Sequence, residues 1–184
     1  MKARIFLTAI LALVLSPAAG AQSSLPRPDT IVKPLAYVSL EPVPRGRAFE
    51  VAVVAEIMDG FHINANKVLQ EYVIPTTLEA ELPKGFKLIE AVYPQGKLWK
   101  FDFSPERLNV YEGKVTLLLK LEAQADAALG AVKLPMKLRY QACNDAVCLP
   151  PVRKSVDVEF EVAAAGTKAQ PLYPGVFSAT KSRP

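Results

Sequence analysis

Apolar residues recur at every second position in several segments of the chain. Residues 155–162 read SVDVEFEV and residues 134–140 read LPMKLRY. Successive side chains of a β-strand point to opposite faces, so this alternation predicts strands that are buried on one face only. No segment has the apolar spacing of an amphipathic helix. The sequence therefore predicts an all-β fold.

Further strands are expected where β-branched residues cluster between turn sequences. The turn sequences are LPKG, YPQG, YEGK and ALG, and Asp59-Gly60 is another strong turn signal. Seven or eight short strands at intervals of about 10–15 residues favour a β-sandwich, and a closed barrel is the main alternative. The additional strands are expected at residues 35–40, 48–58, 73–80, 86–92 and 114–123.

The first residues have the pattern of a secretory signal peptide. Lys2 and Arg4 precede the apolar run 5–15, and Ala19-Gly20-Ala21 supplies small residues for cleavage after Ala21. The run is too short to span a bilayer, which takes roughly 20 apolar residues. A protein exported from the cytoplasm is therefore expected. The expected division is a signal peptide at 1–21, a flexible leader at 22–33, one β-sandwich domain at 34–162 and a flexible tail at 163–184.

The charge pattern argues against a nucleic-acid partner. The formal net charge is +4, and the basic residues are scattered, whereas a nucleic-acid surface gathers them on one face.

The chain has two cysteines, Cys143 and Cys148. An exported protein folds in an oxidising compartment, which favours one disulfide.

The two cysteines lie in the segment YQACNDAVCLPP, residues 140–151. The alternating runs on either side predict a hairpin in which Cys143 and Cys148 face each other across four residues. Directly opposed antiparallel residues have Cα atoms about 4.5–5.5 Å apart, and disulfides prefer about 4.4–6.8 Å. The pair can therefore close and open without dismantling the sheet. Pro150-Pro151 lacks two backbone donors and should interrupt strand pairing just after Cys148.

Three roles for the pair follow from its spacing. A structural disulfide closing about six residues would contribute only about 2 kcal/mol to stability, which favours a redox role without excluding a structural one. Metal binding is the third possible role. Three ligands, Cys143, Cys148 and His62, would be enough for Cu(I) but not for a closed zinc site.

Asp145 lies inside the cysteine loop. It is either a turn former or a carboxylate that perturbs the thiols.

Four segments in order resemble the N-terminal periplasmic domain of the thiol:disulfide interchange protein DsbD. They are DGFHIN (59–64), YVIPTTLEAELPKGF (72–86), YPQGK (93–97) and YQACNDAVCLPP. The resemblance covers roughly residues 35–162. It implies an immunoglobulin-like β-sandwich that needs no cofactor or metal and has protein-disulfide reductase activity.

The resemblance also implies roles and partners. Cys143 and Cys148 would be the redox pair, and Cys148 would form the mixed disulfide. Electrons would arrive from a thioredoxin-like domain or a membrane thiol relay. They would leave to oxidised exported proteins, such as disulfide isomerases and the thioredoxins of cytochrome c maturation.

The chain departs from relatives of that family in four ways. Four residues separate the cysteines where relatives have five. Phe61, His62 and Asn64 stand where relatives place tyrosines near the sulfurs. In relatives a flexible aromatic cap loop shields the active site. Its counterpart in this chain should fall at residues 92–97, with Tyr93 as the capping residue. The chain stops at Pro184, where the interchange protein continues into a membrane relay, so a stand-alone version is expected.

Overall fold

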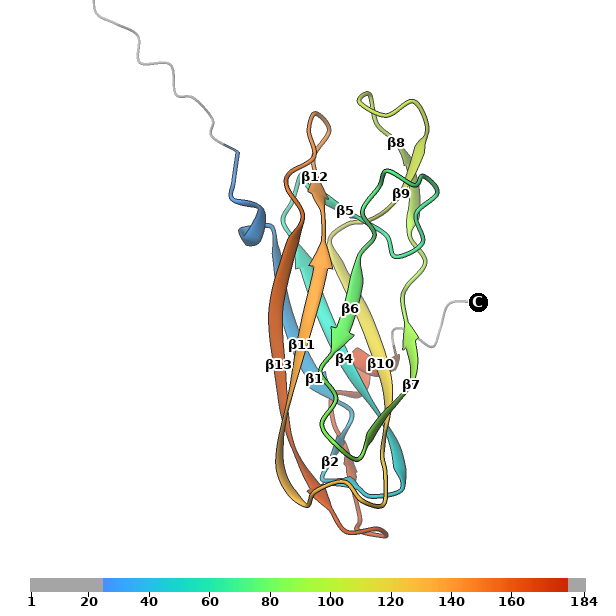
Figure 1. Cartoon of the computed structure of the whole chain (residues 1–184). Helices are drawn as coiled ribbons and strands as arrows, with labels where there is room; N and C mark the ends of the chain where they lie inside the picture. The colour runs from blue at the N-terminus through green and yellow to red at the C-terminus, as the bar shows by residue number, and fades with distance from the viewer. Residues whose placement is uncertain (1–24, 179–184) are drawn as a thin grey trace, which may run out of the picture.

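The computed structural model describes residues 25–178, which form two β-sheets packed face to face (Figure 1). The first sheet has the strand order β1-β4-β10-β7 and the second has the order β3-β13-β11-β6. The fold is an all-β, immunoglobulin-like sandwich, as the sequence predicts, and not a closed barrel. The strands of the first sheet are β1 (Val32–Val38), β4 (Arg47–Ile57), β7 (Phe86–Val92) and β10 (Lys114–Ala123); those of the second are β3 (Val43–Pro44), β6 (Thr77–Ala80), β11 (Gly130–Tyr140) and β13 (Val152–Ala163).

The core fills the space between the two sheets. The inward residues of β4 and β10 contact those of β11 and β13, and Val51, Leu119 and Leu138 have no more than 1% of their surface exposed. Phe49, Phe86 and Phe160 form a three-ring cluster, with centroids 5.3–6.2 Å apart. The period-two alternation of β13 runs through Val156, Val158, Phe160 and Val162, all buried. Alternation thus correctly identified the buried faces.

A third, smaller sheet lies at one end of the sandwich, at the top of Figure 1. Its strand order is β12-β5-β9-β8. The sequence did not predict β5, β8 and β9, because each is short and none alternates clearly; all four residues of β8 are exposed. The strands are β5 (His62–Asn64), β8 (Lys97–Lys100), β9 (Arg107–Tyr111) and β12 (Ala142–Cys143).

The segment before β1 is attached to the second sheet, although residues up to 33 were expected to form a flexible leader. A short 3-10 helix, η1 (Pro28–Thr30), precedes β1. The buried Tyr140 hydroxyl donates to the Pro28 carbonyl at 3.0 Å, and Lys154 Nζ donates to the carbonyls of Asp29 and Val32. The predicted signal peptide at 1–21 lies outside the described residues.

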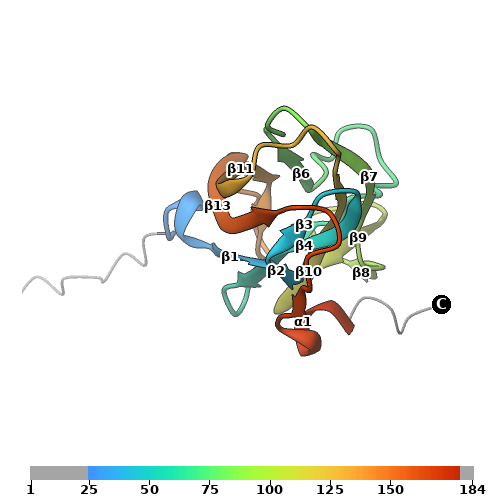
Figure 2. The same ribbon diagram turned by 90° about the horizontal axis from the view of Figure 1, so that it is seen from below.

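The C-terminal segment also packs against the sandwich, where a flexible tail was expected. Strand β14 (Gln170–Pro171) pairs with β2 (Leu40–Glu41). Helix α1 (Pro174–Ser178) then lies on the outer face of the first sheet (Figure 2), where Phe177 is buried against Ala52 and Leu118. These contacts come from residues distant in sequence, so local composition did not reveal them. Within residues 25–178, no helix is long and apolar enough to cross a membrane.

Candidate functional site

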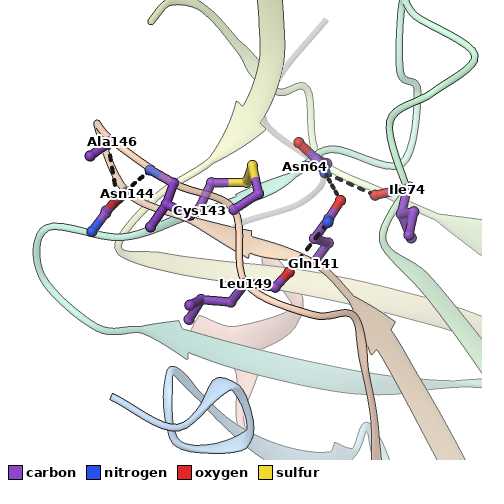
Figure 3. Close-up of a disulfide and its surroundings, with 9 residues drawn as sticks. Asn64, Ile74, Gln141, Cys143, Asn144, Ala146 and Leu149 are labelled. Atoms are coloured by element: carbon purple, nitrogen blue, oxygen red, sulfur yellow. Dashed lines mark hydrogen bonds between the residues drawn. A yellow bond between two sulfur atoms is a disulfide. The ribbon is translucent and has the colours of Figure 1, made fainter. Parts of the chain in front are cut away.

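The two cysteines form a disulfide at the tip of the β11–β13 hairpin (Figure 3). Their Cα atoms are 4.0 Å apart, shorter than expected, and the hydrogen bonds on either side explain why. Asn144 N donates to Val147 O at 3.0 Å, and Leu149 N donates to Ala142 O at 2.8 Å. These bonds make Cys143 and Cys148 a non-hydrogen-bonded pair, the antiparallel position at which strands approach most closely. The predicted hairpin crossing is confirmed.

The two sulfurs occupy different environments. Cys143 lies in β12 between β5 and the returning chain, and it has no exposed surface. Among residues 25–178, Cys148 pairs only with Cys143, through an isolated bridge, and it is exposed. Pro150 and Pro151 add no backbone donors after it, and regular pairing resumes at Val152 opposite Tyr140. Cys148 is therefore the more accessible of the two cysteines.

The loop between the cysteines is a compact turn organised by Asn144. Its Oδ1 accepts hydrogen bonds from Ala146 N at 3.0 Å and from Val147 N at 2.8 Å, which is an Asx-type turn. Asp145 lies exposed at the tip. The turn is thus closed by Asn144, and the Asp145 carboxylate projects from it.

Asn64 and Gln141 support the hairpin beside the disulfide (Figure 3). Asn64 Nδ2 donates to Ile74 O at 3.0 Å and to Gln141 Oε1 at 3.4 Å. Gln141 Nε2 donates to Leu149 O at 3.2 Å, one residue beyond Cys148. Asn64 O also accepts from the buried Thr76 hydroxyl at 2.6 Å. The chain on both sides of the disulfide is therefore held to β5.

His62 is a buried polar residue next to Cys143. It stands directly opposite Cys143 in the β5–β12 pairing and is only 3% exposed. Its ring stacks on Phe101 at 4.1 Å. Burial lowers the pKa of His62 to about 4, and the Asp145 carboxylate opposes this shift only in part. The imidazole is therefore neutral at physiological pH.

The β8–β9 hairpin supplies an aromatic wall to the site. Phe103 stacks on Phe101 with ring centroids 5.3 Å apart, so that His62, Phe101 and Phe103 form one column of rings. The loop is fixed by hydrogen bonds from Lys100 Nζ to Ser104 O and from Ser104 Oγ to Glu106 O. This ordered loop holds Phe103 beside the exposed cysteine.

Two cavities lie on either side of the disulfide. One, of about 330 Å³, is mostly apolar and has Cys148 in its wall. The other, of about 260 Å³, contains His62, Asp145 and Phe61. The lining of the first includes Asn64, Tyr72, Val73, Phe103, Ser104, Pro105, Leu108 and Gln141.

Tyr93, expected to cap the cysteines, lies elsewhere. Its hydroxyl accepts a hydrogen bond from Leu78 N at 2.9 Å, and its ring packs on the main core. The expected cap segment is held by the Tyr111 hydroxyl, which donates to Pro94 O. Phe103, Ser104 and Pro105 line the cavity with Cys148 instead. The alternation of Trp99, Phe101 and Phe103 with charged residues was the available sequence signal for this wall.

The neighbours of the disulfide do not form a metal-ligand set. Within residues 25–178, no group of three or more His, Cys, Asp or Glu side chains has the arrangement of a metal site. Instead, a solvent-accessible cystine lies at the end of a rigid sandwich, next to an apolar cavity. This arrangement is suited to exchange with the thiols of another protein.

The fold and the site define a class of protein: an immunoglobulin-like sandwich with a cystine accessible at one end. The family model described as "Thiol:disulfide interchange protein DsbD, N-terminal" matches residues 28–159. The chain therefore belongs to this family, and its function is thiol–disulfide interchange.

Solved structures include similar domains. The chain is 12% identical to the N-terminal periplasmic domain of ScsB from Proteus mirabilis, with a TM-score of 0.50; the match covers 74% of this chain and 49% of that one. It is 20% identical to the reduced DsbD N-terminal domain of Neisseria meningitidis, with a TM-score of 0.41; the match covers 73% of this chain and 88% of that one. No curated protein matches the chain significantly.

Proposed function

We propose that this protein carries reducing equivalents in the periplasm, from a thioredoxin-like domain or membrane thiol relay to oxidised exported proteins. The single observation that supports the assignment of roles is the difference in exposure between the two cysteines: Cys148 is exposed and Cys143 is fully buried. Thiol–disulfide exchange depends on which sulfur an attacking thiolate can reach. Cys148 is therefore the sulfur that forms mixed disulfides.

Reduction of the pair takes two exchange steps. A donor thiolate attacks Sγ of Cys148, the bond to Cys143 breaks, and Cys143 leaves as a thiolate that takes up a proton. The second donor thiol then attacks the donor sulfur of the mixed disulfide and releases Cys148. The donor ends as a disulfide, and the two electrons and two protons of its dithiol are on this protein.

Reduction of the acceptor reverses these steps. The Cys148 thiolate attacks an acceptor disulfide, and Cys143 then attacks Cys148 to release the reduced acceptor. Disulfide isomerases and the thioredoxins of cytochrome c maturation are acceptors of the right chemistry, since both carry accessible cysteine pairs. Asp145, at the tip of the cysteine loop, is proposed as a supporting residue through its charge.

The surface around Cys148 supports a protein partner. Tyr72 is 68% exposed and Phe103 is 37% exposed, and both line the apolar cavity that contains Cys148. Val147, in the cysteine loop, is 38% exposed. Exposed aromatic and aliphatic side chains that surround a reactive group are typical of a docking surface.

Trapping a mixed disulfide tests this proposal. Cys143→Ser leaves Cys148 without its resolving partner, so a covalent complex with an exported thiol protein should accumulate and disappear on reduction. The matched variant Cys148→Ser, whose remaining cysteine is buried, should trap none.

The reduction potential of the pair is the second test. A value below about −300 mV is the range of structural disulfides. Such a value, together with no trapped complex, would support a binding module with a purely structural hairpin disulfide instead.

A further inference from the structure

The small sheet aligns three side chains across neighbouring strands. Cys143 pairs with His62 on one side and with Cys148 on the other. Directly paired antiparallel residues place their side chains on the same face of a sheet, with Cβ atoms about 4.5–5.5 Å apart. The imidazole of His62 therefore projects from the same face of the sheet as the Cys143 side chain, from the strand on the side opposite Cys148.

The Nε2 atom of His62 is buried without a hydrogen-bond partner among residues 25–178. An unsatisfied buried polar atom destabilises the folded state, so such atoms are uncommon in folded proteins. In the disulfide state, Cys143 Sγ has no proton to donate and is at most a weak acceptor. The oxidised form therefore leaves this nitrogen unpaired.

Reduction changes the hydrogen-bonding capacity of the Cys143 sulfur. A Cys143 thiol donates S–H, and a Cys143 thiolate accepts N–H, so either protonation state is complementary to a neutral imidazole. Stacking on Phe101 holds the ring in place, and Cys143 has no exposed surface. The charged side chains that line the same cavity as His62 are Asp59, Glu112 and Asp145.

We propose that His62 Nε2 forms a hydrogen bond with Cys143 Sγ when the disulfide is reduced, and that this bond makes the pair a stronger electron acceptor. The inference rests on the proposed exchange at Cys143 and Cys148. Two electrons and two protons from a dithiol break the Sγ–Sγ bond. One proton goes to Cys148, and the other is shared between Cys143 Sγ and His62 Nε2. The dithiol leaves as a disulfide.

The equilibrium with dithiothreitol tests the proposal. His62→Phe preserves a ring that can stack on Phe101 but removes the nitrogen. We expect the equilibrium constant for reduction to fall about tenfold, which for a two-electron couple is about 30 mV toward a more reducing potential. His62→Gln, which retains a polar nitrogen, should recover part of the loss.

Thr77→Val is the matched control. Thr77 Oγ1 is also buried without a partner among the described residues, but Thr77 pairs with Arg139 rather than with a cysteine. This variant should leave the equilibrium constant unchanged. Equal constants for wild type and His62→Phe would overturn the proposal.

A measurement on the wild-type protein avoids dependence on the folding of the variants. His62 is the only histidine of the chain, so the ring nitrogens give one unambiguous set of NMR resonances if the tag contains no histidine. The Nε2 resonance should move on reduction. In Cys143→Ala, which also lacks the disulfide but has no Sγ, it should stay near the oxidised position.

Coincidence of the reduced wild-type resonance with that of Cys143→Ala would contradict the proposal. Both experiments use chemical reduction and no protein partner. They therefore remain informative if the trapping experiment fails, and trapping can succeed even if His62 has no effect.

Discussion

Cys143 and Cys148 are covalently joined and directly paired, yet one is fully buried and the other is exposed. The hairpin produces this asymmetry because Cys143 is covered by β5, whereas no strand in the described part of the chain pairs with Cys148 on its other side. The reactivity of a thiol depends on access as well as on its thiolate fraction. The four predictions below follow from this arrangement and from the segments that support it.

The reduced protein should react with iodoacetamide first at Cys148. Cys143 has no exposed surface, so its alkylation requires the hairpin to open. Peptide mass spectrometry of a time course measures both rates, and the rates should become similar in urea, where the hairpin is lost. Equal rates in the folded protein would contradict the asymmetry.

The stability of the protein should fall between pH 6.5 and pH 4 because of His62. Burial lowers the pKa of this side chain to about 4 in the folded protein, with a partial opposing effect from Asp145, while the unfolded chain has a pKa near 6.5. The unfolded state therefore binds the proton first as the pH falls, and the contribution of His62 is present above pH 6.5 and lost toward pH 4. The expected loss is on the order of 3 kcal/mol.

Urea unfolding across this pH range measures the effect. Carboxylates also titrate there, so the informative quantity is the difference between wild type and His62→Phe. The free energy of unfolding of His62→Phe should depend less steeply on pH than that of the wild type. Identical slopes for the two proteins would show that His62 keeps an ordinary pKa.

Phe103→Ala should speed the reduction of the disulfide by a small dithiol several-fold. Phe103 lines the cavity that contains Cys148, and its ring stacks on Phe101, so removing it widens access to the sulfur. Leu98→Ala is the control, since Leu98 is an exposed residue of the same hairpin and is absent from the lining of that cavity. Stopped-flow or gel-shift kinetics would measure the reduction rates of both variants. Equal rates for Phe103→Ala and Leu98→Ala would contradict a shielding role for Phe103.

Phe177→Ala should release the C-terminal segment without altering exchange at the cysteines. Phe177 is 6% exposed and packs on Ala52 and Leu118, and a buried Phe→Ala change costs about 3–5 kcal/mol. Because the segment is terminal, the loss should be largely local. Hydrogen exchange should increase at residues 170–178.

Tyr173→Ala is the matched control for the C-terminal segment. Its ring is half exposed and makes an edge contact with Tyr37, so the effect should be smaller. A change in the reduction rate of the disulfide in Phe177→Ala would mean that the C-terminal segment influences the site.

The long strands were predictable because each carries a local signal, either apolar alternation or β-branched and apolar residues between turn sequences. Strands β7 and β10 begin and end where the sequence predicted, since apolar residues and turn sequences bound them on both sides. The short strands β5, β8 and β9 have too few residues for a pattern. Only pairing with neighbours distant in sequence defines them. The alternation of Trp99, Phe101 and Phe103 with charged residues was visible in the sequence, but it did not show that these rings lie beside the cysteines.

The sequence by itself determined the fold class, the hairpin and the placement of two cysteines across it, because these depend on local alternation and spacing. The tertiary structure alone decided which cysteine is buried and that Phe103 rather than Tyr93 lies beside Cys148. It also buried His62 in the strand paired with Cys143, with an Nε2 atom that has no hydrogen-bond partner among the described residues. Burial and access depend on which distant strands cover a residue. They emerge only when β5 and the β8–β9 hairpin assemble around the tip of the sandwich.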